Sequence, residues 1–399
     1  MSLQDPLQEA DRCVKCGLCL PHCPTYWLLA DEGDSPRGRI ALMQGWLGGS
    51  LADTPRLRAH LDRCLVCRAC ETACPSGVRY GALIAAARGE QRRRKGAWRR
   101  WADGLLPGLI ARLPYGPWPV RLAALYRGLG LQVLVRRFGP PSLRRLDGLL
   151  PARLDAPSLR GFYPAQGKPR RRVALFTGCV GRLADRGALE AAVRLLPRLG
   201  VEVVIPPEQA CCGALHHHAG DAITAERLAE RNRRVFSALE AEALVGVASG
   251  CVAHLRAHAR LPLHSEEIGR LLTDLEWPQG LRPRPLRQRV AVHLPCTQIH
   301  SLRDADSTLR LLGRIPEIDL ITLPENGRCC GGAGAYLLRQ PRIAEALRAH
   351  KIELLRESGA TLLVTTNTGC ALHLAAGIQQ AGLGVELLHP LELLARQLE

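Results

Sequence analysis

The sequence predicts an α/β protein in which a small α-helical domain precedes two tandem modules with parallel sheets. Three observations predict this fold class: the placement of the 16 cysteines, a repeat in the second half of the chain, and alternating strand and helix patterns within each repeat. With 399 residues, the chain is long enough for two or three domains with separate cores. We expect four segments, at residues 1–90, 91–170, 171–285 and 286–399.

Residues 1–90 hold eight cysteines in two groups. Each group has the pattern C-x2-C-x2-C-x3-C-P, at residues 13–24 and 64–75. Bacterial two-cluster ferredoxins use this spacing, and three thiolates of one group share each cluster with the last cysteine of the other group. We therefore predict an α-helical two-[4Fe–4S] ferredoxin-like domain. One cluster is assigned to Cys13, Cys16, Cys19 and Cys74, and the other to Cys64, Cys67, Cys70 and Cys23.

A pair of zinc sites is the alternative for these cysteines. Zinc sites use C-x2-C pairs, whereas this chain has two complete quartets that each end in Cys-Pro. The pattern therefore favours clusters that exchange single electrons. Because the two groups share ligands, the clusters are expected to lie close together, as electron relay requires.

Residues 91–170 contain no cysteine and are rich in Arg, Leu, Pro and Trp. The stretch 97–138 holds three of the six tryptophans among clustered arginines and leucines. Basic amphipathic segments of this kind lie in the membrane interface without spanning it. Two interpretations stay open: docking on the inner leaflet, where the segment would also help to admit a quinone, and packing against a partner or between domains.

The second half of the chain repeats a cysteine pattern. The first unit contains Cys179, Cys211-Cys212-Gly213 and Cys251, with gaps of 31 and 38 residues. The second unit contains Cys296, Cys329-Cys330-Gly331 and Cys370, with gaps of 32 and 39 residues. Each unit is expected to be one α/β Cys-Cys-Gly module.

Each module is expected to contain three buried parallel strands separated by helices. The predicted strands are VALFTG, VEVVIP and ALVGVASG in the first unit, and VAVHLP, IDLITLP and TLLVTTNTG in the second. The predicted helices are residues 187–199, 222–240, 305–314 and 341–357. Right-handed βαβ connections then place every cysteine at the carboxyl ends of strands, where three loops converge.

The four cysteines of each unit are a candidate metal site. A third cluster, a zinc ion and a set of free thiols all remain open for them. His254 and His373 each follow the last cysteine of a unit by three residues and are considered as extra ligands. His216, His217 and His218 follow the first Cys-Cys-Gly triplet. His218, His300 and His373 are the accessory candidates for ligation or proton transfer, against the simpler interpretation of a solvated loop.

The net charge limits the kinds of partner that we expect, and the first residues predict where the protein is located. The net charge is +17, which fits an anionic membrane surface or an acidic protein partner. No nucleic-acid-binding motif accompanies it, so we expect no nucleic acid partner. The opening MSLQDPLQEADR has no apolar export segment, which predicts a cytoplasmic protein. Its thiols are then expected to be reduced and to serve as metal ligands rather than to form disulfides. No run of apolar residues is long enough to span a bilayer.

The cysteine pattern resembles the iron–sulfur subunits of flavin-linked dehydrogenases, including the anaerobic glycerol-3-phosphate dehydrogenase C subunit and heterodisulfide-reductase-like proteins. Further stretches resemble the glycolate oxidase iron–sulfur subunit family. They are SPRGRIALM, HLDRCLVCRACETACPSGVRY, CCGALHHHAG, ASGC, PCTQIH and CCGGAGAY. The heterodisulfide-reductase version of the repeat ends in Cys-x-x-Cys, and both units here lack that last cysteine, so the resemblance does not extend to its non-cubane cluster.

The resemblance implies a heteromeric enzyme. A flavoprotein subunit carrying FAD would oxidise glycolate to glyoxylate, and this chain would carry electrons to a membrane acceptor such as a quinone, as a peripheral protein on the inner face of the membrane. The sequence contains no GxGxxG fingerprint after a strand and no P-loop, so two-electron chemistry is expected on the partner and no catalytic residue is assigned here. Lactate and glycerol 3-phosphate are the alternative substrates, and a structural metal-binding scaffold is the alternative role.

Overall fold

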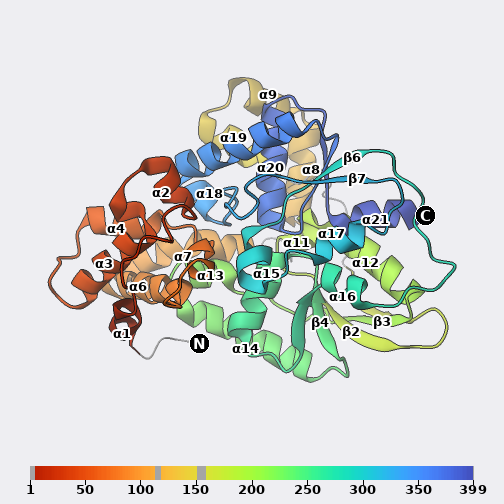
Figure 1. Ribbon diagram of the computed structural model, residues 1–399, viewed down its shortest axis with the longest axis horizontal. Helices are drawn as coiled ribbons and strands as arrows, with labels where there is room; N and C mark the ends of the chain where they lie inside the picture. The colour runs from red at the N-terminus through yellow and green to blue at the C-terminus, as the bar shows by residue number, and fades with distance from the viewer. Residues whose placement is uncertain (1–4, 113–117, 151–158, 399) are drawn as a thin grey trace.

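The computed structural model describes residues 5–112, 118–150 and 159–398. The chain forms a helical N-terminal domain, a run of surface helices and two α/β modules. Figure 1 shows the N-terminal domain, in red and orange, at one end of the molecule, and the two sheets toward the other end. Among the described residues, no helix is both long and apolar enough to cross a membrane.

The N-terminal domain is built from helices, and α1, α2, α3 and α4 each begin at a proline. In α2 and α3 the proline occupies the first helical position, where its missing N–H costs nothing. The Ser35 side chain accepts a hydrogen bond from Gly38 N and caps α3. The elements are α1 (Pro6–Asp11), α2 (Pro24–Leu29), η1 (Glu32–Asp34), α3 (Pro36–Leu47), α4 (Pro55–Asp62), α5 (Ala69–Thr72) and α6 (Tyr80–Arg94).

The segment between the domains is helical. It forms α7 (Ala97–Arg112), α8 (Trp118–Gly128), α9 (Leu131–Phe138) and α10 (Pro141–Gly148). Part of the stretch 97–138 falls on residues 113–117, which lie outside the described residues. Of α9, no residue is buried.

The first α/β module has a five-stranded sheet in the order β1-β3-β2-β4-β5. The strands are β1 (Gly161–Tyr163), β2 (Arg171–Phe176), β3 (Val201–Ile205), β4 (Ala243–Gly246) and β5 (His264–Glu267). The helices are α11 (Gly181–Ala184), α12 (Arg186–Arg198), α13 (Ala214–His218), α14 (Ala222–Ser237), α15 (Ser249–His254), the π-helical turn η3 (Leu255–Ala259) and α16 (Ile268–Asp274).

The second module has a four-stranded parallel sheet in the order β7-β6-β8-β9. The strands are β6 (Arg289–Val292), β7 (Asp319–Thr322), β8 (Leu362–Val364) and β9 (Glu386–Leu388). The helices are the π-helical turn η4 (Thr297–Leu302), α17 (Ser307–Leu312), α18 (Tyr336–Arg339), α19 (Pro341–Ser358), α20 (Thr368–Gln380) and α21 (Pro390–Leu398).

The predicted α/β fold class is confirmed, including all six predicted strands and their parallel pairing. One strand differs from the expectation, because β1 lies in the segment predicted as linker and pairs antiparallel with β3. Its three residues, Gly-Phe-Tyr, are too few to show a strand period. The predicted helix at 222–240 ends earlier, at Ser237, and the predicted helix at 305–314 is shorter, at Ser307–Leu312.

One hydrophobic core joins the two modules. It contains residues of β2, β4, β6 and β8 together with the apolar faces of α12, α16, α17 and α21. Figure 1 shows these helices between the two sheets. The modules therefore share a central layer of helices, and the loops at the carboxyl ends of the strands in both modules are held in fixed positions.

Candidate metal centres

The first N-terminal cysteine loop surrounds a small cavity. Its lining includes Cys13, Cys16 and Cys19 of the first quartet together with Cys74, the last cysteine of the second quartet. Lys15 and Gly17 have φ angles of 55° and 85°, so the loop turns through the left-handed region between its cysteines. The chain reversal brings the three sulfur positions to one side.

The second loop repeats this geometry around a second cavity. Cys64, Cys67 and Cys70 line it together with Cys23. Val66 has a φ angle of 54°, which a β-branched residue adopts only under strain. The Val66 backbone N–H donates a hydrogen bond to Cys64 Sγ, with 3.4 Å between N and Sγ, so the loop turns a backbone donor toward one of its own sulfurs.

The two cavities are neighbours, since Cys70 lines both of them. The last cysteine of each quartet lies with the first three of the other quartet, which is the arrangement that the sequence predicts. All-sulfur donor sets suit iron–sulfur clusters, so the chemistry of the residues fits [4Fe–4S] clusters.

A buried cation lies at the second cavity. Arg39 is 1% exposed and lines that cavity. Its guanidinium donates to Asp34 Oδ1 at 3.0 Å, to Thr25 Oγ1 at 3.0 Å and to the His60 carbonyl at 2.6 Å. The residue therefore ties α3 to α2, η1 and α4 while it places positive charge beside the thiols.

The cysteines of the first Cys-Cys-Gly module converge as predicted. Cys211 Sγ lies 3.4 Å from Cys179 Sγ, and Cys212 hydrogen-bonds Cys251. The hydrogen bond with Cys179 lowers the pKa of the Cys211 thiol to about 3. This set of thiols thus stabilises a thiolate in a buried pocket, which is the state in which cysteine binds metals.

The second module contains the same set with two additional side chains. The hydrogen bond with Cys329 lowers the pKa of the Cys330 thiol well below its usual value, and His293 acts in the same direction. His293, Cys330 and Cys370 are all buried, and their candidate ligand atoms lie within 4.8 Å of one another. The Lys351 ammonium, 1% exposed, donates to the carbonyls of Pro324 and Glu325 beside this set.

His293 is a site residue that the sequence analysis missed. It stands three residues before Cys296, and the repeat places Phe176 at the matching position before Cys179. In the sequence, only this histidine-for-phenylalanine difference between the two units pointed to His293. Its Nδ1 hydrogen-bonds Thr365 Oγ1 at 2.9 Å, which leaves Nε2 for the thiols.

The accessory histidines have other partners. His300 bridges two domains, with Nδ1 3.0 Å from Thr72 Oγ1 and Nε2 2.9 Å from the Gly327 carbonyl. His373 is buried and its Nε2 lies 3.0 Å from the Ala344 carbonyl, so that nitrogen carries a proton and is not a ligand. His218 lies at the rim of a cavity described below.

The second module lies directly against the N-terminal domain. Leu65, Cys67, Cys296 and Cys329 belong to one hydrophobic cluster. Burial raises the pKa of the Cys67 thiol well above its usual value, and the neighbouring Cys296 raises it further. The second N-terminal cavity and the second Cys-Cys-Gly set are therefore adjacent.

A cavity of about 340 Å³ opens at the junction of the N-terminal domain and both modules. Cys64 forms part of its wall, and Tyr336 and His218 line it from the two modules. Its polar side comes from one face of α6, where Arg88, Gln91 and Arg92 follow one another at helical spacing. Arg88 Nε, Gln91 Nε2 and Arg92 Nη1 are buried donors without a hydrogen-bond partner.

Helix α7 borders this cavity through Asp103 and carries an exposed apolar stripe. Trp98, Trp101, Leu105 and Leu109 are 72%, 54%, 48% and 53% exposed, and their spacing places them on one face. The indole rings of Trp98 and Trp101 stack with centroids 4.7 Å apart. Exposed apolar surface of this extent is typical of an interaction surface.

Comparison with known proteins identifies families for both parts of the chain. A family described as 4Fe-4S dicluster domain matches residues 9–78, and one described as Cysteine-rich domain matches residues 173–256 and 290–375. The probable glycolate oxidase iron-sulfur subunit of Bacillus subtilis is 33% identical, over 97% of this chain and 93% of that protein. The glycolate oxidase iron-sulfur subunit of Escherichia coli is also 33% identical, over 91% and 89%. Lactate utilization protein A of Geobacillus kaustophilus is 27% identical, over 56% of this chain and 98% of that protein.

The dicluster domain and the paired Cysteine-rich domains define an iron–sulfur protein with [4Fe–4S] clusters that serves electron transfer in an oxidoreductase. Relatives named as subunits indicate that it works within a multi-subunit enzyme. The chain belongs to the family of glycolate oxidase iron–sulfur subunits.

Proposed function

We propose that this chain relays electrons from a separate FAD-containing subunit, which oxidises glycolate to glyoxylate, to a quinone at the inner surface of the cell membrane. Glycolate releases two electrons and two protons, and a quinone that becomes a quinol takes up the same number of each. Near-full-length similarity to two glycolate oxidase subunits is the observation that carries the proposal.

We assign one [4Fe–4S] cluster to Cys13, Cys16, Cys19 and Cys74 and the other to Cys64, Cys67, Cys70 and Cys23. When bound, each cluster accepts and releases one electron. The grouping of these cysteines around two adjacent cavities supports the assignment. Arg39 would offset the negative charge of the second cluster, and the surrounding apolar residues exclude water from it.

The cavity at the three-domain junction is the proposed site for the quinone head group. Its wall contains Cys64, so an acceptor bound there lies next to a cluster ligand. Arg88, Gln91 and Arg92 line this cavity, and their guanidinium and amide groups suit carbonyl oxygens that gain negative charge on reduction. Proton uptake by the reduced quinone is then completed from solvent.

The apolar stripe of α7 is the proposed membrane contact. Arg99 and Arg100 lie next to the exposed tryptophans, and such a combination binds anionic lipid surfaces. Because α7 borders the junction cavity, a chain docked in this way holds the cavity near the bilayer surface, where the quinone tail lies. The alternative, a protein partner on the same stripe, is distinguished by the lipid test below.

Copurification of the flavoprotein followed by substrate assays tests the proposal. We expect the complex to reduce a short-chain quinone with glycolate, and to do so faster than with lactate or glycerol 3-phosphate. Faster turnover with lactate would reassign the substrate, in keeping with the similarity to lactate utilization protein A. Clusters that no substrate and no chemical reductant can reduce would leave only the scaffold role.

Substitutions in the junction cavity test quinone reduction separately from the reduction of the clusters by glycolate. Gln91→Leu and Arg92→Ala should lower quinone reduction while glycolate still reduces the clusters. Arg93→Ala is the matched control, because Arg93 lies on another face of α6 with a side chain that is 73% exposed. Equal quinone rates in all three would remove the cavity from the proposal.

A second pair of variants tests the membrane contact. Trp98→Glu with Trp101→Glu should abolish cosedimentation with vesicles that contain anionic lipid. Ile223→Glu is the control, since Ile223 is 83% exposed on a different helix. Unchanged sedimentation of the double variant would favour the protein-partner interpretation of α7.

A further inference from the structure

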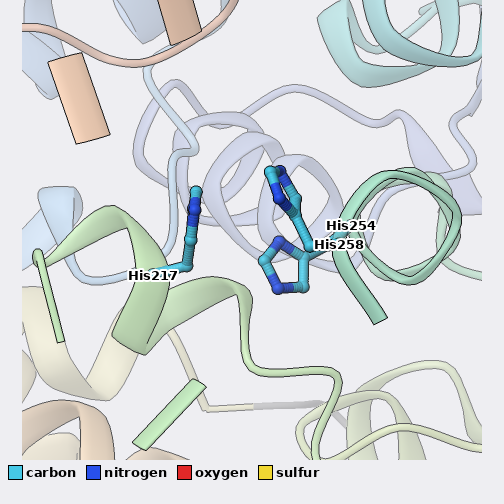
Figure 2. A group of neighbouring side chains, drawn as sticks. All are labelled: His217, His254 and His258. Carbon is cyan, nitrogen blue, oxygen red and sulfur yellow. The ribbon is translucent and has the colours of Figure 1, made fainter. Parts of the chain in front are cut away.

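Three histidines of the first Cys-Cys-Gly module face one another without partners. His217 comes from α13, His254 ends α15, and His258 lies one turn further along in η3. Figure 2 shows the three rings beside one another, with His217 on a different segment from His254 and His258. The ring centroids of His217 and His258 are 4.2 Å apart, those of His254 and His258 4.8 Å, and those of His217 and His254 5.2 Å.

Other histidines buried in the described part of the chain each have a polar partner. The Nδ1 atoms of His60 and His216 make no hydrogen bond, but they lie 3.3 and 3.5 Å from the carboxylate oxygens of Asp34 and Asp221. His293, His300, His373 and His389 each place a ring nitrogen within 3.0 Å of a hydroxyl or a backbone carbonyl. By contrast, His217 Nδ1 is buried with no hydrogen-bond partner, and no described residue bonds a ring nitrogen of His254 or His258. A buried polar atom is rarely left unpaired, so His217 Nδ1 is expected to have a ligand, and the two neighbouring rings are placed to share it.

The chemical state of the rings suits a metal ion. Burial lowers the pKa of His217 to about 4 and that of His258 to about 3, and it lowers the pKa of His254 well below its usual value. At neutral pH all three are therefore uncharged and offer lone pairs. One candidate ligand nitrogen from each ring lies within 4.8 Å of the others.

We propose that His217, His254 and His258 bind a divalent transition metal ion, with Zn²⁺ as the best-suited species. Three imidazoles and one open position form a common zinc coordination. Nitrogens about 2.0 Å from a tetrahedral ion are roughly 3.3 Å from one another, so small ring rotations close the site. His254 and His258 have the i, i+4 spacing that presents two imidazoles from one helical face.

The site is a property of the first module alone. Counted from the cysteines, the positions that match His217 and His258 in the second module are Ala335 and Gly377. Only His373 matches His254, and its Nε2 is used by the Ala344 carbonyl. The ion would link the helix that follows the Cys-Cys-Gly triplet to the helix that follows Cys251, and so fix the loops that carry three of the four cysteines of this module.

Zinc titration of the cluster-containing protein tests the proposal. The protein, washed with EDTA under anaerobic conditions, is titrated with Zn²⁺ against a chromophoric chelator, and X-ray absorption at the zinc edge identifies the ligands. We expect one zinc per chain with nitrogen ligands near 2.0 Å and no sulfur ligand near 2.3 Å.

Two single substitutions complete the test. His217→Ala and His258→Ala should each weaken zinc binding by about 100-fold or more, since even the loss of an outer-shell partner costs roughly 10–100-fold. His264→Ala is the control, because His264 is exposed on β5. Circular dichroism and iron content check that each variant folds. The absence of saturable zinc binding, sulfur ligands at the zinc, or equal affinity in all four proteins would overturn the proposal.

Discussion

The ligand exchange between the two N-terminal quartets gives the sharpest prediction. Cys23 is 6% exposed and lines the cavity of Cys64, whereas Cys74 lines the cavity of Cys13. If Cys23 and Cys64 hold the same cluster, replacing both by alanine removes one cluster, or about four irons. Replacing Cys74 and Cys64 instead removes both clusters, or about eight irons.

If each quartet instead held a cluster of its own, the Cys23/Cys64 double variant would lose about eight irons and the Cys74/Cys64 double variant about four. The two double variants therefore distinguish shared ligation from ligation within each quartet. Iron and acid-labile sulfide are measured per chain after anaerobic purification, as differences from the wild type, so that iron elsewhere in the chain cancels. Cys23→Ala and Cys64→Ala alone should each lose the same iron as their combination, since the second change acts on a site already lost. A loss near eight irons in the Cys23→Ala/Cys64→Ala protein would refute the shared arrangement.

Three further predictions concern stability. Arg39→Leu removes one of the two guanidinium groups that pair with Asp34, while Arg63 stays in place. The free energy of unfolding should therefore fall by about 2–3 kcal/mol in denaturant titrations, against about 0.5 kcal/mol or less for Arg270→Ala in an exposed helical pair. Burial lowers the pKa of His389 to about 4 from 6.5, so its neutral form stabilises the fold above pH 6.5 and that stability is lost as the pH falls toward 4. His389→Gln should remove roughly 3 kcal/mol of this pH dependence, and equal pH curves for both proteins would contradict the assignment. Tyr336→Phe deletes the hydrogen bond to the Arg63 carbonyl and should cost about 1 kcal/mol, measured by thermal unfolding with cluster content as the control.

The sequence by itself determined the fold class and the repeat, and it predicted how the cysteines are grouped. These features depend on spacings along the chain: a C-x2-C-x2-C loop fixes its own geometry, and alternating apolar strands and helices leave few topologies. The strand β1 escaped prediction because three residues carry no period.

Only the tertiary structure revealed the junction cavity and the group of three histidines, because both are formed by residues from separate elements. The junction cavity combines Cys64, His218 and Tyr336 from three parts of the chain, and no local pattern shows that one face of α6 lines it. The same holds for the histidines. His300 and His373 looked like candidate ligands in the sequence, yet backbone carbonyls occupy a ring nitrogen of each, whereas the partnerless group around His254 exists only because α13 packs beside α15. Whether a polar side chain is paired or free depends on which atoms packing brings to it, and this information is not local in the sequence.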